Sequence, residues 1–195
     1  MTTWYIIRHG ETLNNRKHIK QGQCASLLTL KGIKQSKSIA KRLQKLEPDF
    51  SKFKFITSPI VRTKHTMQII LETLNLDTEP IEDSSIMSRN KGIFQGCPKK
   101  EFPDRFPKEY EEIQKDPWNY TPPNGESLET AHKRFLEFLE KYKNEENLII
   151  VMHKRGSTTL RMLLEKKSKQ EIREAGANHN QDFFFKWDDK QIIQL

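Results

Sequence analysis

Two arginines and two histidines stand at or just beyond the ends of apolar stretches that are typical of buried strands. Arg8 and His9 close one such stretch, His153 closes another, and Arg62 comes one helical turn after a third. Ligands of open α/β sheets bind outside the carboxyl ends of the strands, so we expect these four side chains to meet there. Two guanidiniums and two imidazoles together favour a dianion such as phosphate, which accepts charge-assisted hydrogen bonds.

A metal site is disfavoured at this place. Arginines repel a cation, and no carboxylate is directly adjacent to His9 or His153. The two cysteines, Cys24 and Cys97, form neither a metal-binding pattern nor a disulfide framework. We therefore expect no metal, and two free thiols in a reducing cytoplasm.

The elements that must position these residues alternate between strands and helices. The predicted strands occupy 4–9, 53–58, 79–81 and 147–153, and "DFFFKW" with "QIIQL" forms a closing hairpin. The predicted helices occupy 30–46 after the capping Thr29, 59–75, 125–144 and 156–167. This order predicts an α/β fold, a three-layer sandwich with a mostly parallel sheet, an antiparallel edge at the C-terminus and helices on both faces.

The length of 195 residues suits one domain covering 1–195. Residues 83–125 differ from the rest because they hold six prolines and one plausible helix at 107–115. Long irregular segments of this kind are usually lids or binding loops, so this insertion is predicted to shape the substrate pocket.

Composition narrows the class of partner. The net charge is +8, but Lys and Arg are scattered along the chain and form no basic stripe interleaved with aromatics, which disfavours nucleic acid. No apolar run reaches membrane-spanning length, and the N-terminus lacks the features of a signal peptide. We expect a cytoplasmic protein with a phosphorylated small molecule as its partner and no membrane partner. The sequence carries no signal for oligomeric state.

Blocks of sequence in the expected order resemble the histidine phosphatase superfamily, the phosphoglycerate mutase-like proteins. The blocks are "RHGETLNN" (8–15), "QG" (21–22), "LLTLKG" (27–32), "SPIVRTKHT" (58–66), "PPNGES" (122–127) with Arg134, "VMHKRG" (151–156) and "ANHNQDFFF" (177–185). The resemblance covers nearly the whole chain. Because the chain is short, it is closer to the smaller phosphatases of the family than to the mutases.

The resemblance implies a role for each of the four strand-end residues. His9 is the nucleophile, whose Nε2 carries the phosphoryl group as a phosphohistidine. Arg8, Arg62 and His153 bind the phosphoryl oxygens and neutralise the charge that develops on them. Water then hydrolyses the phosphoenzyme. Neither a metal nor a cofactor is implied, because the guanidiniums supply the positive charge.

The resemblance also implies a set of substrate-binding residues around the nucleophile. Asn15 is expected to donate to the phosphate, and Thr12, Gln21 and Gly22 are expected to line the substrate entrance.

One position departs from the family pattern. The family usually places a glutamate, which protonates the leaving oxygen, four residues before a glycine. Here "IMSRNKGIFQG" (86–96) has Ser88 at that position, and Ser88 is therefore expected to be a substrate-binding residue. A serine hydroxyl is too weak an acid near neutral pH, and losing a positioned acid costs about 10²–10⁴ in rate.

Three interpretations follow from Ser88. In the first, another carboxylate replaces the acid, and the candidates in or beside the irregular segment are Glu82, Asp83, Glu101 and Asp104. In the second, the substrate has a good leaving group, as protein phosphohistidine or an acyl phosphate has. In the third, the protein is a pseudophosphatase that binds phosphorylated ligands with little turnover.

Lys154 and Arg155 directly follow His153, where the family commonly has small residues. If they face the pocket, they favour a substrate with a second anionic group. If they face solvent, they are two exposed cations at the start of a helix. The sequence leaves both alternatives open.

Overall fold

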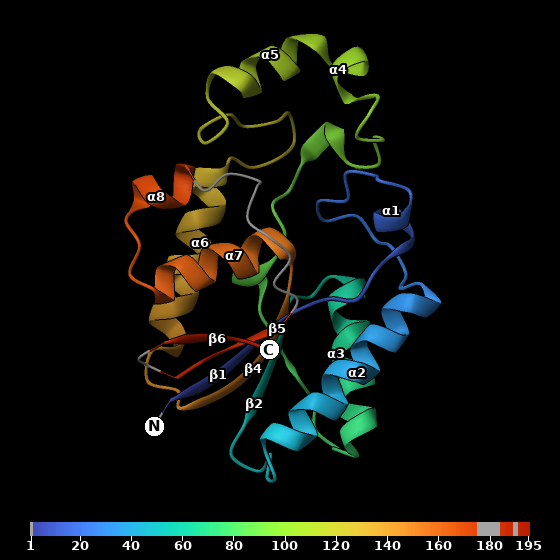
Figure 1. Ribbon diagram of the computed structural model, residues 1–195. Coiled ribbons are helices and arrows are strands. Elements are labelled where there is room, and N and C mark those ends of the chain that lie inside the picture. Colours follow the sequence, from blue (N-terminus) through green and yellow to red (C-terminus); the bar gives the residue numbers. More distant parts are fainter. Residues whose placement is uncertain (1, 175–183, 189–190) are drawn as a thin grey trace.

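The computed structural model describes residues 2–174, 184–188 and 191–195. Six strands in these residues form one sheet in the order β3-β2-β4-β1-β5-β6 (Figure 1). The strands are β1 (Thr3–Arg8), β2 (Lys54–Thr57), β3 (Ile81–Glu82), β4 (Asn147–Met152), β5 (Phe184–Trp187) and β6 (Ile192–Gln194). The pairs β3–β2, β2–β4 and β4–β1 are parallel, whereas β1–β5 and β5–β6 are antiparallel. The predicted mostly parallel sheet with an antiparallel C-terminal edge is confirmed.

The register of the two central strands brings both strand-end histidines together. Arg8 of β1 lies opposite Met152 of β4, so the next residues along the two strands, His9 and His153, are also neighbours. The backbone N–H of His9 extends the ladder by donating to the Met152 carbonyl at 3.0 Å. Parallel pairing is what places both side chains at the same edge of the sheet.

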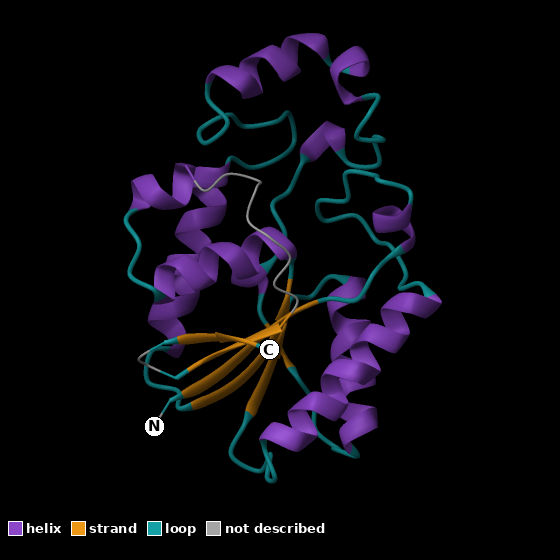
Figure 2. Cartoon of the chain, in the orientation of Figure 1, coloured by secondary structure: helices purple, strands orange, loops and turns teal. Residues whose placement is uncertain are grey.

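Helices cover both faces of the sheet, as predicted (Figures 1 and 2). Helices α2 and α3 pack on one face, around a core that includes Tyr5, Leu43 and Met67. Helices α6 and α7 pack on the other face, around a core that includes Trp4 and Phe138. The helices are α1 (Leu13–Arg16), α2 (Leu30–Leu46), α3 (Val61–Leu74), α4 (Phe102–Arg105), α5 (Pro107–Lys115), α6 (Leu128–Tyr142), α7 (Lys154–Leu164) and α8 (Lys169–Glu174).

Local signals explain where the long helices begin. The Thr29 hydroxyl accepts the backbone N–H of Gly32 at 3.0 Å and caps α2, and the Ser127 hydroxyl accepts that of Thr130 at 3.0 Å and caps α6. The apolar spacing of 59–75 also predicts that Val61 lies on the inner face of α3, and this is wrong. Val61 is 42% exposed, whereas its neighbours Arg62 and Thr63 are buried, so the inner face of the first turn consists of these two residues.

The irregular segment between β3 and α6 contains short 3₁₀ turns and the helices α4 and α5. The helix predicted at 107–115 is confirmed as α5. Phe94, Cys97 and Phe102 form the buried centre of a small core here, and the rings of Phe106 and Tyr110 pack against it. Figure 1 shows α4 and α5 standing beyond the carboxyl ends of the central strands, so this segment faces the site.

Element boundaries shift slightly from the predicted ones. Strand β3 covers only Ile81–Glu82, and the helix predicted at 156–167 begins at Lys154 and ends at Leu164. It ends there because Lys166 adopts the left-handed conformation, with φ 57°, which stops the helix. The block "ANHNQDFFF" before Phe184 lies outside the described residues. No helix in the described ranges has the length and apolar character needed to cross a membrane.

Candidate active site

The loop after β1 holds His9 against the sheet through tight backbone packing. Gly10 directly follows His9, and a Cβ atom at Gly10 would collide with the backbone of Gly32 in α2. The N–H of Gly10 donates to the Thr66 hydroxyl of α3 at 3.1 Å. His9 itself is buried, with 4% of its surface exposed. Its ring is therefore fixed by its surroundings.

Hydrogen bonds determine the tautomer of His9. The Nδ1 atom lies 2.8 Å from the Gly10 carbonyl oxygen, which can only accept, so Nδ1 carries the proton and donates it. The Nε2 atom accepts from Nε of Arg62 at 3.2 Å. Nε2 therefore keeps its lone pair, and it is the ring nitrogen that can act as a nucleophile.

Arg62 is the centre of the site. Besides His9, its guanidinium donates to the carbonyls of Gly22 at 2.7 Å and Cys24 at 3.1 Å, and to Nδ1 of His153 at 3.1 Å. Arg62 comes from the first turn of α3, and it is one of the largest fully buried side chains in the described residues. A single planar group thus fixes two histidines and the loop after α1.

His153 has the opposite tautomer to His9. Because its Nδ1 accepts from Arg62, its Nε2 carries the proton and donates to the Ser58 hydroxyl at 2.9 Å. Ser58 directly follows β2, so three parallel strands contribute to one cluster. The two imidazole rings lie 5.4 Å apart, centroid to centroid.

Burial and positive charge keep both imidazoles neutral. Burial lowers the pKa of His9 well below 6.5, and the charges of Arg62 and Arg8 lower it further, against the opposing effect of the Gly10 carbonyl. Burial and the Arg62 charge lower the pKa of His153 in the same direction. Burial also lowers the pKa of Arg62, to about 10, which still leaves it charged near neutral pH.

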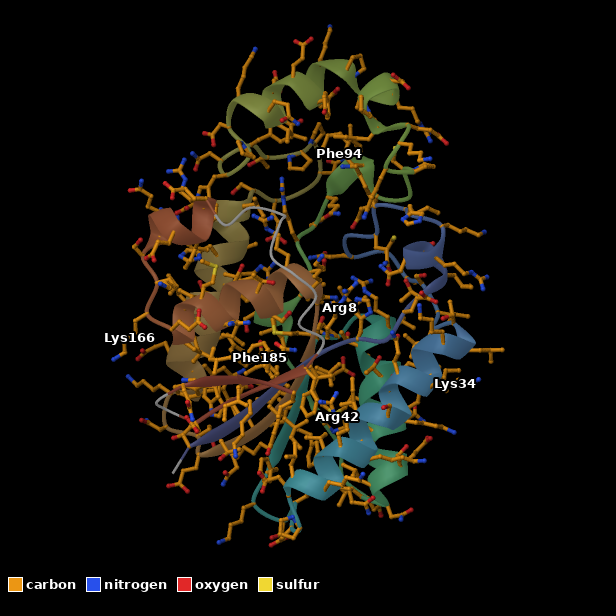
Figure 3. All side chains as sticks on the ribbon, viewed as in Figure 1. Arg8, Lys34, Arg42, Phe94, Lys166 and Phe185 are labelled. Carbon is orange, nitrogen blue, oxygen red and sulfur yellow. The ribbon has the colours of Figure 1, made fainter. Side chains whose placement is uncertain are left out.

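A cavity of about 660 Å³ opens above this cluster. Its wall includes all four predicted catalytic residues, Arg8, His9, Arg62 and His153, together with Ser88. Figure 3 shows Arg8 near the ends of the strands and Phe94, which also lines the cavity, in the irregular segment above. The cavity therefore extends from the sheet edge to that segment.

The predicted entrance residues have different positions. Asn15, Gln21 and Gly22 line the cavity, whereas Thr12 lies beneath it, fully buried. The Thr12 hydroxyl caps α1 by accepting the backbone N–H of Asn15, and it donates to the side-chain oxygen of Gln21 at 3.0 Å. Thr12 thus holds two cavity residues in place rather than forming the wall itself.

Gly22 occupies a position that favours glycine. Its φ of +55° lies in the left-handed region, and a Cβ atom there would collide with the side chain of Gln95. Its carbonyl is the acceptor for Arg62. The conformation of this residue therefore aims a backbone oxygen at the buried guanidinium.

The carboxylates that could replace the missing acid lie outside the cavity. Glu82 pairs with Lys64 at 2.5 Å, Glu101 pairs with Arg105 at 3.4 Å, and Asp83 accepts from Lys141 at 2.7 Å. Asp104 is exposed on α4. None of these four lines the cavity, and neither does any other Asp or Glu among the described residues. The substitute-carboxylate interpretation therefore finds no support in the described part of the chain.

Four further cations line the outer half of the cavity and were missed by sequence reasoning. Lys20, Arg89, Lys91 and Lys99, which we call the outer cation group, come from the loop after α1 and from the irregular segment. The only available signal was that they flank the "QG" and "GIFQG" blocks. Lysines are usually solvated, so that signal alone could not place them.

The structure resolves the alternative for the two residues after His153. Lys154 and Arg155 both line the cavity. Lys154 remains exposed, whereas Arg155 is half-buried, and burial lowers its pKa. These residues therefore add positive charge to the cavity.

Comparisons with known proteins identify the family of this chain. A family model described as the histidine phosphatase superfamily (branch 1) matches residues 4–189. A 2,3-bisphosphoglycerate-dependent phosphoglycerate mutase from Bartonella bacilliformis is 30% identical over 176 residues, which cover 87% of this chain and 84% of that protein. One of the same name from Parvibaculum lavamentivorans is 26% identical over 191 residues, covering 95% and 90%.

Solved structures share the fold. The alpha-ribazole phosphatase from Shigella flexneri superposes with a TM-score of 0.80 at 22% identity, covering 96% of this chain and 90% of that one. A mycobacterial glucosyl-3-phosphoglycerate phosphatase superposes with a TM-score of 0.73 at 20% identity, covering 95% and 92%. With the family model matching nearly the whole length, this chain belongs to branch 1 of the histidine phosphatase superfamily.

Proposed function

We propose that this protein is a phosphatase that hydrolyses a phosphorylated small molecule through a phosphohistidine at Nε2 of His9, without a metal ion. The observation that carries the proposal is the tautomer of His9, because the Gly10 carbonyl holds the proton on Nδ1 and leaves the Nε2 lone pair in the cavity. The phosphatase names of the structural neighbours support hydrolysis. The mutase names of the curated relatives make phosphoryl transfer to a second substrate group the competing reaction.

In the first step, the Nε2 lone pair of His9 attacks phosphorus, and the bond from phosphorus to the leaving oxygen breaks. The ring becomes a cation, which the Gly10 carbonyl stabilises by accepting the Nδ1–H hydrogen bond at 2.8 Å. Arg62 turns its N–H groups from the two imidazoles to the phosphoryl oxygens, where negative charge gathers. Water then attacks phosphorus, the N–P bond breaks with its electron pair returning to Nε2, neutral His9 is regenerated, and dihydrogen phosphate leaves the cavity.

His153 changes its role when a dianion enters. Its Nδ1 accepts a hydrogen bond from Arg62 while the site holds no anion. Negative charge close to a buried imidazole raises its pKa, so His153 takes up a proton and its Nδ1 becomes a donor to the phosphate. Ser58 holds the ring in place through Nε2 in both states.

A protein phosphohistidine substrate is the second candidate. The observation that favours it is that no described Asp or Glu lines the cavity, so no carboxyl group is placed to protonate a poor leaving group. Phosphohistidine needs little protonation to depart. A pseudophosphatase that only binds phosphorylated ligands is the third candidate, because it too needs no carboxyl group in the cavity.

The cytoplasmic location stays a prediction.

The direct test is to trap the phosphoenzyme. Wild-type protein mixed with radiolabelled acetyl phosphate and quenched in base should carry one acid-labile phosphate, and His9→Ala should carry none. Hydrolysis of p-nitrophenyl phosphate should fall by about 10⁴-fold in His9→Ala, since the nucleophile is lost. His65→Ala, on α3 away from the cavity, is the matched control.

The same experiment separates the candidates. If the protein forms a phosphoenzyme but hydrolyses only acetyl phosphate and phosphohistidine, its substrate is an activated phosphate and not a small-molecule phosphate ester. If no phosphoryl donor gives a phosphoenzyme and the protein still binds inorganic phosphate tightly, the protein is a pseudophosphatase that binds phosphorylated ligands.

A further inference from the structure

One face of α6 lines the cavity but serves no step of the proposed reaction. The cavity residues from this helix are Leu128, Ala131, His132 and Phe135, which we call the α6 wall. Their spacing of three and four residues places them on the same side of the helix. Three of the four are apolar, and Ala131 and Phe135 also belong to the core between the helix and the sheet. His132 is therefore a polar side chain in an otherwise apolar wall.

The ring nitrogens of His132 form no hydrogen bond in the described part of the chain. The side chain is only 6% exposed. Its Nδ1 atom is buried and has no partner, whereas its Nε2 atom, which also has none among the described residues, is not buried. Buried polar groups normally have a hydrogen-bond partner, because leaving one unpaired costs free energy. An unpaired imidazole in a cavity wall therefore points to a partner that enters the cavity.

The burial of Nδ1 decides which tautomer of His132 is favoured. A proton on Nδ1 would be a buried N–H donor without an acceptor, which folded proteins rarely contain. A proton on Nε2 is on the accessible side of the ring, where it can be donated. Burial also lowers the pKa of His132, and the charge of Lys169 adds to this effect while that of Glu129 opposes it. His132 therefore presents an uncharged N–H donor at neutral pH.

Trp118 lies beside His132 and is fixed to the first turn of α6. The two rings are 5.5 Å apart, centroid to centroid, and Trp118 also lines the cavity. The indole Nε1 of Trp118 donates to the Glu129 carboxylate. The Trp118 carbonyl accepts the backbone N–H groups of Leu128 at 3.1 Å and Glu129 at 3.2 Å. The position of this indole is thus set by the fold before any ligand binds.

Helix α8 supports the same arrangement from outside the cavity. Figure 1 shows α8 next to the beginning of α6. Lys169 of α8 donates to the second oxygen of the Glu129 carboxylate at 2.9 Å, and the guanidinium of Arg173 lies 5.9 Å from the centre of the Trp118 ring. Both oxygens of Glu129 are therefore engaged by Trp118 and Lys169. The N–H of His132 is left for another acceptor.

The chemistry of the α6 wall differs from that of the sheet edge. At the sheet edge, Arg62 and two imidazoles are placed for the oxygens of a phosphoryl group. The α6 wall contains no charged side chain, and it lines the same cavity. A molecule whose phosphoryl group is at His9 can therefore place an uncharged part against this wall.

We propose that His132 is a specificity-determining residue, whose Nε2–H donates to an uncharged acceptor on an aromatic leaving group that packs on Trp118 and the α6 wall. This inference rests on the proposed function for the phosphoryl group at His9. An aromatic group fits because Trp118 and Phe135 offer ring surfaces, against which a flat ring packs in favourable geometries. An uncharged acceptor fits because the imidazole is a neutral donor in apolar surroundings.

The test measures binding, so that it does not depend on turnover. The probes are alkyl phosphonates that end in a phenyl ring or a pyridyl ring, with linkers of increasing length and all three pyridyl isomers, at pH 8, where pyridine is uncharged. Calorimetry should show that the best phenyl probe binds wild type at least about tenfold more tightly than the alkyl phosphonate without the ring, because the ring buries apolar surface. The best pyridyl probe should bind at least as tightly as its phenyl counterpart, since its nitrogen exchanges water for the N–H of His132.

The decisive variant is His132→Phe, which keeps a ring against Trp118 and removes the donor. The affinity of the pyridyl probe should fall about tenfold or more relative to the phenyl probe, because the buried pyridine nitrogen then has no hydrogen bond. The affinity for methylphosphonate should change less than about threefold, since the phosphoryl site is untouched. His65→Phe makes the same exchange on α3, outside the cavity, and should keep the wild-type ratio.

Nitrogen NMR gives a readout on the wild-type protein, which decides the question if His132→Phe misfolds. Long-range ¹H–¹⁵N spectra of histidine-labelled protein should show His132 as the neutral tautomer with its proton on Nε2. The pyridyl probe should shift the Nε2 resonance, and the phenyl probe should leave it in place. His132→Gln, which lacks the imidazole, assigns the signal by its absence.

The outcomes are separable from those of the proposed function. An unchanged ratio of pyridyl to phenyl affinity in His132→Phe, an Nε2 resonance that ignores the pyridyl probe, or no gain from either ring in wild type would overturn the inference. His132 would then be a core residue packed on Trp118. A ratio that depends on His132 in a protein that forms no phosphoenzyme would support the α6 wall and refute the phosphatase.

Discussion

The inner and outer halves of the cavity are built in different ways. At the sheet edge, His9, Arg62 and His153 are buried and satisfy one another through hydrogen bonds between 3.1 and 3.2 Å. In the outer half, Lys20 and Lys91 form no ion pair with an Asp or Glu of the described residues, and they stand on loops beside a separate aromatic core. The inner half is thus held together by its own hydrogen bonds, whereas the outer half gathers cations along the cavity wall.

This difference teaches where chemistry and selectivity reside. A nucleophile must be held in one tautomer and one orientation, which a strand end packed under two helices provides. Selectivity for a particular substrate needs only charge and shape around the leaving group, which an irregular segment can supply. Variants in the inner half should therefore change the rate for every substrate, and variants in the outer half should change the choice of substrate.

The largest effect after loss of His9 is expected at Arg62. Arg62→Lys keeps the charge but cannot reach two imidazoles and the carbonyls of Gly22 and Cys24 together, because an ammonium lacks the planar fork. We expect kcat/KM for p-nitrophenyl phosphate and for alkyl phosphates to fall equally, by about 10²–10³-fold.

Arg16→Lys, an exposed arginine on α1, is the control for this change. Steady-state kinetics on both substrate classes make the measurement. A fall confined to one class would break the division between the two halves, since it would assign selectivity to the inner site.

A smaller effect is expected from restoring a carboxyl group in the cavity. Ser88→Glu should raise kcat for butyl phosphate by about 10²-fold and leave p-nitrophenyl phosphate within about threefold, because only the alkoxide needs a proton. Nearby Arg89 and Lys91 lower the pKa of the new carboxyl group, so the gain should be larger at pH 5.5 than at pH 7.

Ser88→Gln has nearly the same shape without an acidic proton and should give no gain. An equal gain for Glu and Gln would indicate a packing effect. No gain at either pH would show that protonation of the leaving group does not limit the reaction.

The smallest effect concerns stability and tests the neutrality of the inner half. The pKa values of His9 and His153 in the folded protein lie well below 6.5, so below pH 6.5 the unfolded chain binds more protons than the folded one. Their contribution is present above pH 6.5 and is lost as the pH falls. Between pH 7 and pH 5.5, each histidine should lower the free energy of unfolding by about 1 kcal/mol.

Urea titrations at the two pH values measure this loss. His9→Gln should remove about half of the loss of unfolding free energy that the two histidines cause. The same loss in wild type and His9→Gln would mean that His9 is already charged in the folded protein.

Much of the molecule was predictable from local patterns. The parallel strands, the helices α2 and α6 and the C-terminal hairpin follow from apolar periodicity, and the start of α2 follows from its capping residue Thr29. The four strand-end residues follow from the rule that parallel strands present their carboxyl ends at one edge. That residues 1–195 form a single domain, and the catalytic roles of these residues, stay predictions.

The supporting role of Thr12 and the gathering of the outer cations were not predictable, for physical reasons. Thr12 is hydrophilic and follows the "RHGE" motif, yet it caps a short helix under the cavity instead of lining it. Lys91 looks like any exposed lysine until Gly92 and Pro123 turn its segment towards the loop that carries Lys20. Contacts of this kind depend on non-local packing, which no periodicity encodes.

The sequence by itself determined that the chain forms a mostly parallel sheet and that polar residues follow several of its strands. It also determined that a serine, Ser88, stands where a glutamate is usual. These features depend on residue type and short-range pattern. Only the tertiary structure decided the tautomer of His9, the central position of Arg62 and the gathering of the outer cations. Each of these is a contact between residues far apart in the chain, and such contacts exist only once the sheet, its helices and the irregular segment have packed together.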